Sequence, residues 1–108
     1  VTGLGMINAV GNDKETSFKA ICDGVCGIDR ITLFDPEAYS AQIAGEVKDF
    51  DPSTVMAPKE VKKADGFIHL ALKAAQEAMA DANLAEDTDM ERMGISAGSG
   101  IGGLPAIE

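Results

Sequence analysis

The sequence is poor in positive charge and has no long hydrophobic run. Its 108 residues carry nine Lys and Arg against eighteen Asp and Glu, a formal net charge of −9. Such a surface repels a phosphate backbone, which argues against nucleic acid as a partner. No apolar run approaches the roughly 20 residues that span a bilayer, and the start shows no basic-then-apolar signal segment. We therefore expect no membrane span and a cytoplasmic location.

Cysteine and histidine are scarce as well. Cys22 and Cys26 are the only cysteines, and no second pair is present to complete a zinc site of the usual spacing. Free cysteine is among the most buried residue types, so we expect both thiols to be buried and structural. His69 is the only histidine and lies in a helical pattern, which favours a structural or partly exposed side chain over a catalytic one. No metal site or cofactor is predicted.

The composition, with 45% hydrophobic and 25% charged residues, is typical of a globular protein. Asn12 followed by Glu15 resembles a capping box and predicts the start of a helix, which Gly24 is placed to end in a left-handed conformation. One face of that helix is apolar and contains Phe18, Ile21, Cys22 and Val25. Residues 27–41 combine turn chemistry with isolated apolar residues and predict mostly loop.

Later segments alternate between strand and helix patterns. Residues 42–47 predict an edge strand or a protruding hairpin. Pro58 suits the first position of a helix, and an alanine-rich apolar stripe predicts that the helix runs to about Asn83, with a break near Asp65. We expect that helix to be buried on much of its surface and residues 93–97 to form a short buried strand. This order of elements predicts an α/β fold.

A glycine cluster, GSGIGG at residues 98–103, follows the last predicted strand. Its spacing fits the dinucleotide-binding pattern, in which glycines bring backbone N–H groups close to a pyrophosphate. The acidic residue that would support this alternative falls about 20 positions further on, beyond Glu108, and no P-loop lysine follows. The other interpretation is a sharp turn that leaves Ile101, the one bulky apolar side chain of the cluster, free to move.

Both ends of the sequence are abrupt. The first five residues read as the end of an apolar strand, and the last ones show no helix stop or polar tail. We expect residues 1–108 to be one incomplete half-domain of a longer chain.

Several motifs in order resemble the opening of the β-ketoacyl-acyl-carrier-protein synthase II family. The resemblance covers essentially the whole chain and rests on VTGLGM at 1–6, GN at 11–12, GI at 27–28, FD at 34–35, AGEVKDFDP at 44–52, D-x-F at 65–67 and GSGIGG at 98–103. The AGEVKDF run with the glycine cluster favours synthase II over the related synthase I branch. Asn83 departs from the pattern, because the family usually has glycine there.

The resemblance implies a thiolase-like layered αβαβα fold, of which this chain is the N-terminal part. It implies a cytoplasmic, homodimeric enzyme of fatty acid elongation that needs no cofactor. Such an enzyme transfers an acyl chain to a cysteine, decarboxylates malonyl-carrier protein and joins the two. The family's catalytic cysteine and two histidines are not matched here, so we expect the isolated segment to be inactive.

Two features of the family map onto residues of this chain. Ile101 matches an isoleucine that lines the acyl pocket and moves to admit the growing chain. Lys59, Lys62 and Lys63 match basic positions that receive the acidic acyl carrier protein, although such a cluster is often only a solvated helix face. A small dinucleotide-binding domain and a noncatalytic carrier-binding module are the alternatives from other classes of function.

Overall fold

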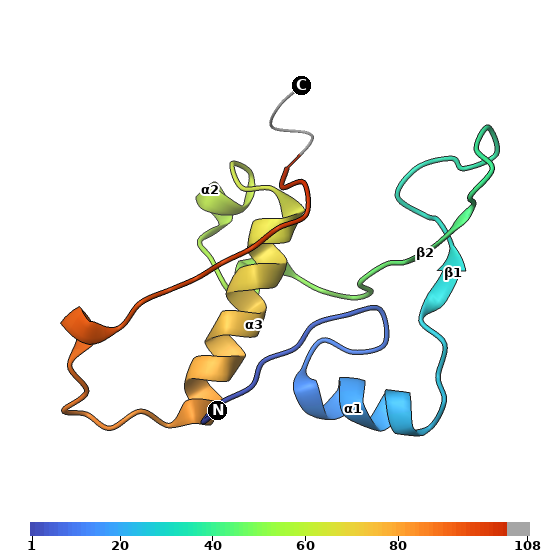
Figure 1. Ribbon diagram of the computed structural model, residues 1–108. Helices are drawn as coiled ribbons and strands as arrows, with labels where there is room; N and C mark the ends of the chain where they lie inside the picture. Colours follow the sequence, from blue (N-terminus) through green and yellow to red (C-terminus); the bar gives the residue numbers. More distant parts are fainter. Residues whose placement is uncertain (104–108) are drawn as a thin grey trace. The chain divides into compact units, whose positions relative to one another are not determined.

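The computed structural model describes residues 1–103 and shows a mixed α/β chain (Figure 1). The chain divides into two compact units. The first, which we call the α3 unit, joins Val1–Gly5 to Pro52–Glu108, of which residues 52–103 are described. The second, the hairpin unit, comprises Met6–Asp51.

The hairpin unit begins with a turn that packs on helix α1 (Lys14–Cys22). The predicted start of this helix was wrong by one residue. Asp13, rather than Asn12, occupies the N-cap, and its carboxylate accepts hydrogen bonds from the Thr16 backbone N–H at 2.8 Å and the Thr16 hydroxyl at 2.9 Å. An Asp carboxylate caps well because it accepts from N–H groups that have no intrahelical partner.

The end of α1 is as predicted. Gly24 adopts a left-handed conformation with φ of 72° and donates to the carbonyl of Ile21, while the Val25 N–H donates to the carbonyl of Ala20. These two bonds form the Schellman motif that closes many helices. The predicted apolar face of α1 is nevertheless uncovered within the described residues, since Phe18, Ile21 and Val25 are all exposed.

Strands β1 (Ile28–Arg30) and β2 (Ile43–Gly45) pair antiparallel, with Asp29 opposite Ala44. The hairpin predicted for residues 42–47 is therefore confirmed. The prediction of a loop over 27–41 missed β1, because three residues without a strong alternation carry little sequence signal and the pairing itself supplies the order.

The carboxylate of Glu46 closes the connection between the two strands. It accepts hydrogen bonds from the Thr32 hydroxyl at 2.7 Å, from the Thr32 backbone N–H at 3.1 Å and from the Leu33 N–H at 3.3 Å. These donors hold the pKa of Glu46 below its ordinary value, the Thr32 hydroxyl most of all, with partial desolvation opposing them. The carboxylate thus fixes the path of the chain as it leaves β1.

In the α3 unit, the long helical pattern is divided as expected into α2 (Pro58–Val61) and α3 (Gly66–Ala82). Pro58 stands at the first position of α2, where a missing N–H costs nothing. Asn83 ends α3 in a left-handed conformation with φ of 46°. Asn is among the few residues with a side chain that end helices in this conformation, which glycine adopts without a steric cost.

Helix α3 is contacted along its carboxyl-terminal half by the extended residues 1–5. A Cβ atom on Gly5 would overlap the carbonyl of Ala74 and lie 2.8 Å from the Ala78 nitrogen, and one on Gly3 would lie 2.8 Å from the Ala82 Cβ. The Leu4 N–H also donates to the Asp81 carboxylate at 2.9 Å. Glycine on one side and alanine on the other therefore let the two backbones touch.

Residues 93–97 were predicted to form a buried strand, and this was wrong for the described structure. Residues 94–97 are extended and exposed, with Ile95 97% accessible, and no hydrogen bond joins them to another described residue. A strand is stabilised by its ladder partners, and no partner strand lies within residues 1–103.

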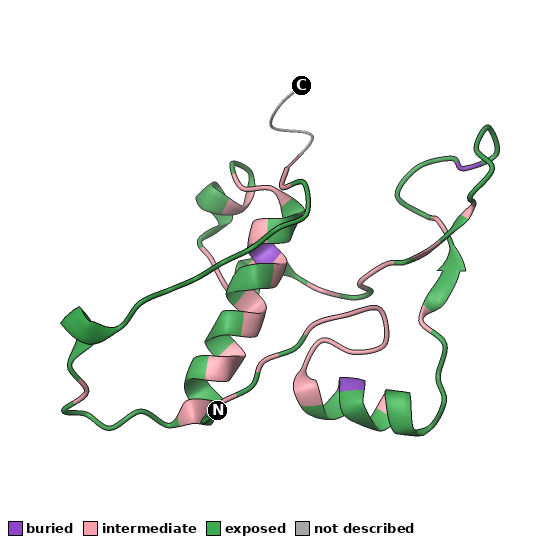
Figure 2. Cartoon of the chain, in the orientation of Figure 1, coloured by how far each residue is buried: buried purple, intermediate pink, exposed green. Residues whose placement is uncertain are grey.

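Burial is slight in both units (Figure 2). Among residues 1–103 no large hydrophobic side chain is buried, and Ser17, Pro36 and His69 are the buried positions. The chain exposes 8529 Å², although even two separate folded bodies of half its mass would expose only about 6,900 Å² together. The expectation that α3 is buried on much of its surface is wrong within the described residues. No helix in this part of the chain is long and apolar enough to cross a membrane.

The contact between Gly5 and α3 predicts that Gly5→Ala loosens the helix. The added methyl group forces the backbones apart, at a cost of about 1–3 kcal/mol, and hydrogen exchange of the α3 amides at residues 78–82 should become roughly 5- to 150-fold faster. Mass spectrometry after exchange measures this. Gly66→Ala is the control, because nothing lies within 4 Å of its added Cβ; equal protection in both variants would contradict the contact.

The Glu46 network predicts a titration within the hairpin. Because the folded pKa of Glu46 is lowered, its ionised carboxylate contributes fully to the stability of the hairpin above the ordinary value of about 4.3. That stability is lost as the pH falls through the folded pKa. The amide resonances of Thr32 and Leu33 should therefore titrate with a midpoint below about 4.3. Glu46→Gln should abolish that titration and Glu37→Gln should not; a midpoint above the ordinary value would refute the assignment.

Candidate functional site

The residues with a predicted role, Ile101 and the three lysines at 59, 62 and 63, lie in the α3 unit around the start of α3. Lys59 is in α2, and Lys62 and Lys63 follow that helix. The backbone N–H groups of Lys63 and Ala64 both donate to the Glu60 carbonyl, at 2.9 and 3.1 Å, and this closes the turn. All three lysines are exposed. We call them the lysine turn. Glu60 is also exposed, so the turn carries a net excess of positive charge on a strongly acidic chain.

The glycine loop, residues 98–103, presents Ile101 to solvent, and the residue is 72% accessible. Ser99 shapes the loop, because its hydroxyl accepts a hydrogen bond from the Gly102 N–H at 3.0 Å. Gly102 has φ of 81°, a left-handed conformation that glycine adopts without strain. The sharp turn predicted for this cluster is therefore confirmed at Gly102.

The end of the glycine loop lies against the start of α3. A Cβ atom on Gly103 would overlap the Asp65 carboxylate and lie 2.9 Å from the Asp65 Cβ, and one on Gly102 would lie 4.0 Å from the Phe67 ring. Sequence reasoning missed this contact, because it joins residues almost forty positions apart. The D-x-F pattern at residues 65–67 marks Asp65, but it does not indicate which residue Asp65 contacts.

The two cysteines do not behave as expected. Cys22 and Cys26 are both free and exposed, so the prediction that they are buried was wrong for the described structure. Their segment is the end of α1 and the turn after it, and no described element covers that surface. His69 is buried in α3, as a structural role allows, and its Nε2 has no hydrogen-bond partner within the described residues.

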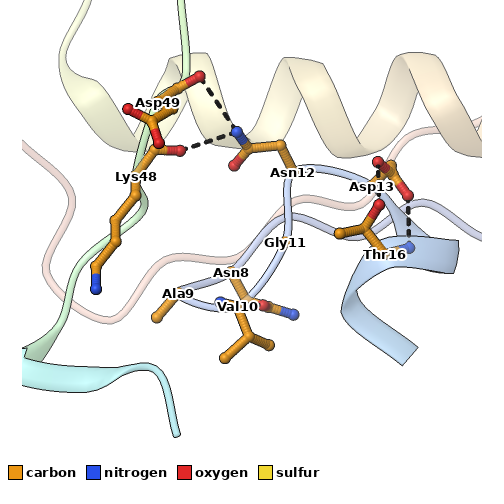
Figure 3. Close-up of a pocket in the computed structure, with 9 residues that line it drawn as sticks. All are labelled: Asn8, Ala9, Val10, Gly11, Asn12, Asp13, Thr16, Lys48 and Asp49. Atoms are coloured by element: carbon orange, nitrogen blue, oxygen red, sulfur yellow. Dashed lines mark hydrogen bonds between the residues drawn. The ribbon is translucent and has the colours of Figure 1, made fainter. Parts of the chain in front are cut away.

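The hairpin unit contains a separate open hollow, drawn in Figure 3, lined by residues 8–13, Thr16, Lys48 and Asp49. Its two asparagine side chains are engaged with the backbone. The Asn12 amide donates to the carbonyls of Lys48 and Asp49, at 2.9 and 3.3 Å, and the Asn8 side chain accepts from the Val10 N–H at 2.9 Å.

This arrangement gives the hollow a structural purpose. Asp49 has φ of 54°, a conformation that costs energy for a residue with a side chain, and the Asn12 amide holds it in place. The one hydroxyl beside a carboxylate in the described hollow, Thr16 on Asp13 at 2.9 Å, belongs to the cap of α1. Within residues 1–103, no group of three or more His, Cys, Asp or Glu is arranged to hold a metal ion.

The geometry of the glycine loop does not support the alternative of a dinucleotide-binding site. Its fingerprint follows a strand and opens a helix. Residues 94–97 pair with no strand, and residues 98–103 form a turn rather than a helix start. Residues 104–108 lie outside the described part of the chain.

Comparison with known proteins places the chain. It matches the family model described as "Beta-ketoacyl synthase, N-terminal domain" over residues 1–108. It is 40% identical over 109 residues to 3-oxoacyl-[acyl-carrier-protein] synthase 2 of Coxiella burnetii (strain RSA 493 / Nine Mile phase I), and 41% identical to the synthase 2 of Staphylococcus aureus (strain N315). Each alignment covers 100% of this chain and 26% of the relative.

A solved structure agrees with the sequence relatives. The ishigamide ketosynthase/chain length factor superposes with a TM-score of 0.70 at 32% sequence identity, over 81% of this chain and 22% of that chain. The chain thus spans about a quarter of the length of the relatives that it matches. The resemblance inferred from the ordered motifs is confirmed: residues 1–108 belong to the β-ketoacyl synthase family and match the model of its N-terminal domain.

Proposed function

We propose that residues 1–108 are the N-terminal section of a chain-elongating β-ketoacyl-acyl-carrier-protein synthase of the synthase II type. The observation that carries the proposal is the match of the whole chain to the family's N-terminal domain, with about 40% identity to proteins named 3-oxoacyl-[acyl-carrier-protein] synthase 2. The intact enzyme is a cytoplasmic homodimeric acyltransferase of fatty acid synthesis that uses no cofactor. No specific observation favours the dinucleotide-binding or carrier-binding modules.

The reaction is a decarboxylative Claisen condensation. A cysteine thiolate takes the acyl group from a carrier thioester and releases the carrier's thiol. Malonyl-carrier protein loses carbon dioxide, and the resulting carbanion attacks the enzyme-bound acyl thioester and expels the cysteine thiolate. The cysteine and the histidines that assist it lie outside residues 1–108. What this segment supplies is substrate recognition, through the lysine turn and Ile101.

The incomplete burial supports a larger, layered fold. Residues 94–97 offer an unpaired extended backbone, and the apolar face of α1, with Phe18 and Ile21, has no cover among the described residues. In the thiolase-like αβαβα arrangement, further strands pair with such a segment and further layers cover such a face. We therefore propose that residues 1–108 are an incomplete half-domain.

Ile101 has the properties that an acyl pocket needs. Its side chain is apolar and accessible, and it stands between Gly100 and Gly102, which leave its backbone pliant. A branched aliphatic group in that position can contact a hydrocarbon chain and move aside as the chain lengthens. How far the Ile101 side chain moves then sets which acyl chain lengths the enzyme prefers.

The first test is catalytic. A full-length protein that carries residues 1–108 should condense an acyl-carrier protein with malonyl-carrier protein and release one carbon dioxide per turnover, and the 108-residue segment alone should not. Mass spectrometry of the carrier-bound product measures the condensation. Iodoacetamide should inactivate the full-length protein by alkylating a cysteine other than Cys22 and Cys26; inactivation through either of these two would overturn the proposal.

The lysine turn predicts how the carrier protein is recognised. Lys62→Glu with Lys63→Glu reverses the local charge, so the KM for carrier-bound substrate should rise about tenfold, and the effect should shrink with added salt because electrostatic steering is screened. The KM for a small acyl thioester without a carrier should not change.

The matched control for the lysine turn is Lys19→Glu with Lys48→Glu, which reverses two exposed lysines in the hairpin unit and so changes the net charge by the same amount. Its KM for carrier-bound substrate should stay within twofold of the parent's. Equal effects of the two changes would mean that net charge, rather than the lysine turn, governs recognition.

A further inference from the structure

The side chain of Asp65 has an unexpected environment. Asp65 occupies the N-cap of α3, yet its carboxylate makes no capping hydrogen bond. The two other Asp residues at N-cap positions within residues 1–103 both cap: Asp13 accepts from Thr16 at 2.8 Å, and Asp89 accepts from the Glu91 N–H at 3.1 Å. A capping bond is worth about 1 kcal/mol, so its absence at Asp65 points to another use of the side chain.

That use is contact with the glycine loop. The Asp65 carboxylate fills the space in which any side chain at residue 103 would lie, and its Cβ is 2.9 Å from that position. The Phe67 ring approaches the same loop at Gly102. The carboxyl end of the loop is therefore seated on the two residues that flank the first residue of α3.

The Asp65 backbone is itself held firmly. Its carbonyl accepts hydrogen bonds from the N–H groups of Ile68, at 2.9 Å, and His69, at 3.4 Å, in the first turn of α3. By contrast, nothing lies within 4 Å of a Cβ atom on Gly98 or Gly100. The loop is thus fixed at one end and open at the other, and Ile101 lies two residues from the fixed end.

We propose that Asp65 is a positioning residue for Ile101: by seating Gly103 it sets the hinge about which the glycine loop moves, and so the acyl lengths that the enzyme elongates. This inference rests on the proposed role of Ile101 in the acyl pocket. It assigns to Asp65 a packing role rather than an electrostatic one, since its shape is what excludes a side chain at residue 103.

The test compares long and short acyl primers in the full-length ketosynthase. Asp65→Ala removes the seat of the loop, so the ratio of kcat/KM for a long primer to that for a short one should rise at least threefold. Gly103→Ala pushes the loop off the same seat and should shift the ratio in the same direction. In the double variant the overlap with the carboxylate is gone and only the 2.9 Å approach to the Cβ of residue 65 remains, so the ratio should be closer to that of Asp65→Ala than additive effects would give.

Two controls separate positioning from general damage. Asp65→Asn keeps the shape of the side chain and should retain the parent's ratio. Asp89→Ala removes a capping Asp that does not touch the loop and should also leave the ratio unchanged. Gly103→Ala probes the contact from the opposite side, so it decides the question if Asp65→Ala fails to fold.

Ile101→Ala distinguishes the proposed role of Ile101 in the acyl pocket from the proposed role of Asp65. If it shifts the ratio while Asp65→Ala and Gly103→Ala lower kcat equally for all primers, the role of Asp65 is overturned and that of Ile101 stands. If Ile101→Ala leaves the ratio unchanged, the acyl-pocket role fails and the positioning role fails with it. Additive effects in the double variant would likewise overturn the shared contact.

Discussion

Direct contact between main chain and helix, made possible by glycine, organises the α3 unit. Near the end of α3, Gly3 and Gly5 let an extended segment lie on the helix backbone, and at its start Gly103 lets the glycine loop lie on Asp65. A single methyl group at Gly5 or Gly103 would separate the partners. Such contacts gain dispersion energy only at short range, so the arrangement tolerates little displacement.

The features predicted correctly from the sequence are those that neighbouring residues determine. Gly24 and Asn83 end helices through their own backbone conformations, and Pro58 begins one because its missing N–H is harmless there. The error at Asn12 is of the same kind and small: Asp13 is the better acceptor, and the Asn12 amide is held by carbonyls of residues 48 and 49.

The features predicted wrongly depend on distant partners. Residues 94–97 have the composition of a buried strand, but burial and pairing come from neighbours that no described residue provides. The expected burial of Cys22 failed for the same reason. The candidate site shows both cases. Motifs identify Ile101 and the lysine turn, whereas the contact between Asp65 and Gly103 arises only in the folded chain.

The short distance along the chain between Lys63 and Asp65 has a consequence for the intact enzyme. Only Ala64 separates the residue proposed to meet the carrier from the residue proposed to seat the loop, and the Ala64 N–H is tied back to Glu60. Binding of the carrier protein and movement of the glycine loop would then both depend on the conformation of residues 63–65. Under the two proposals, a shift of the backbone at residues 63–65 would act on both surfaces, whereas a change of side-chain charge alone would act on carrier recognition.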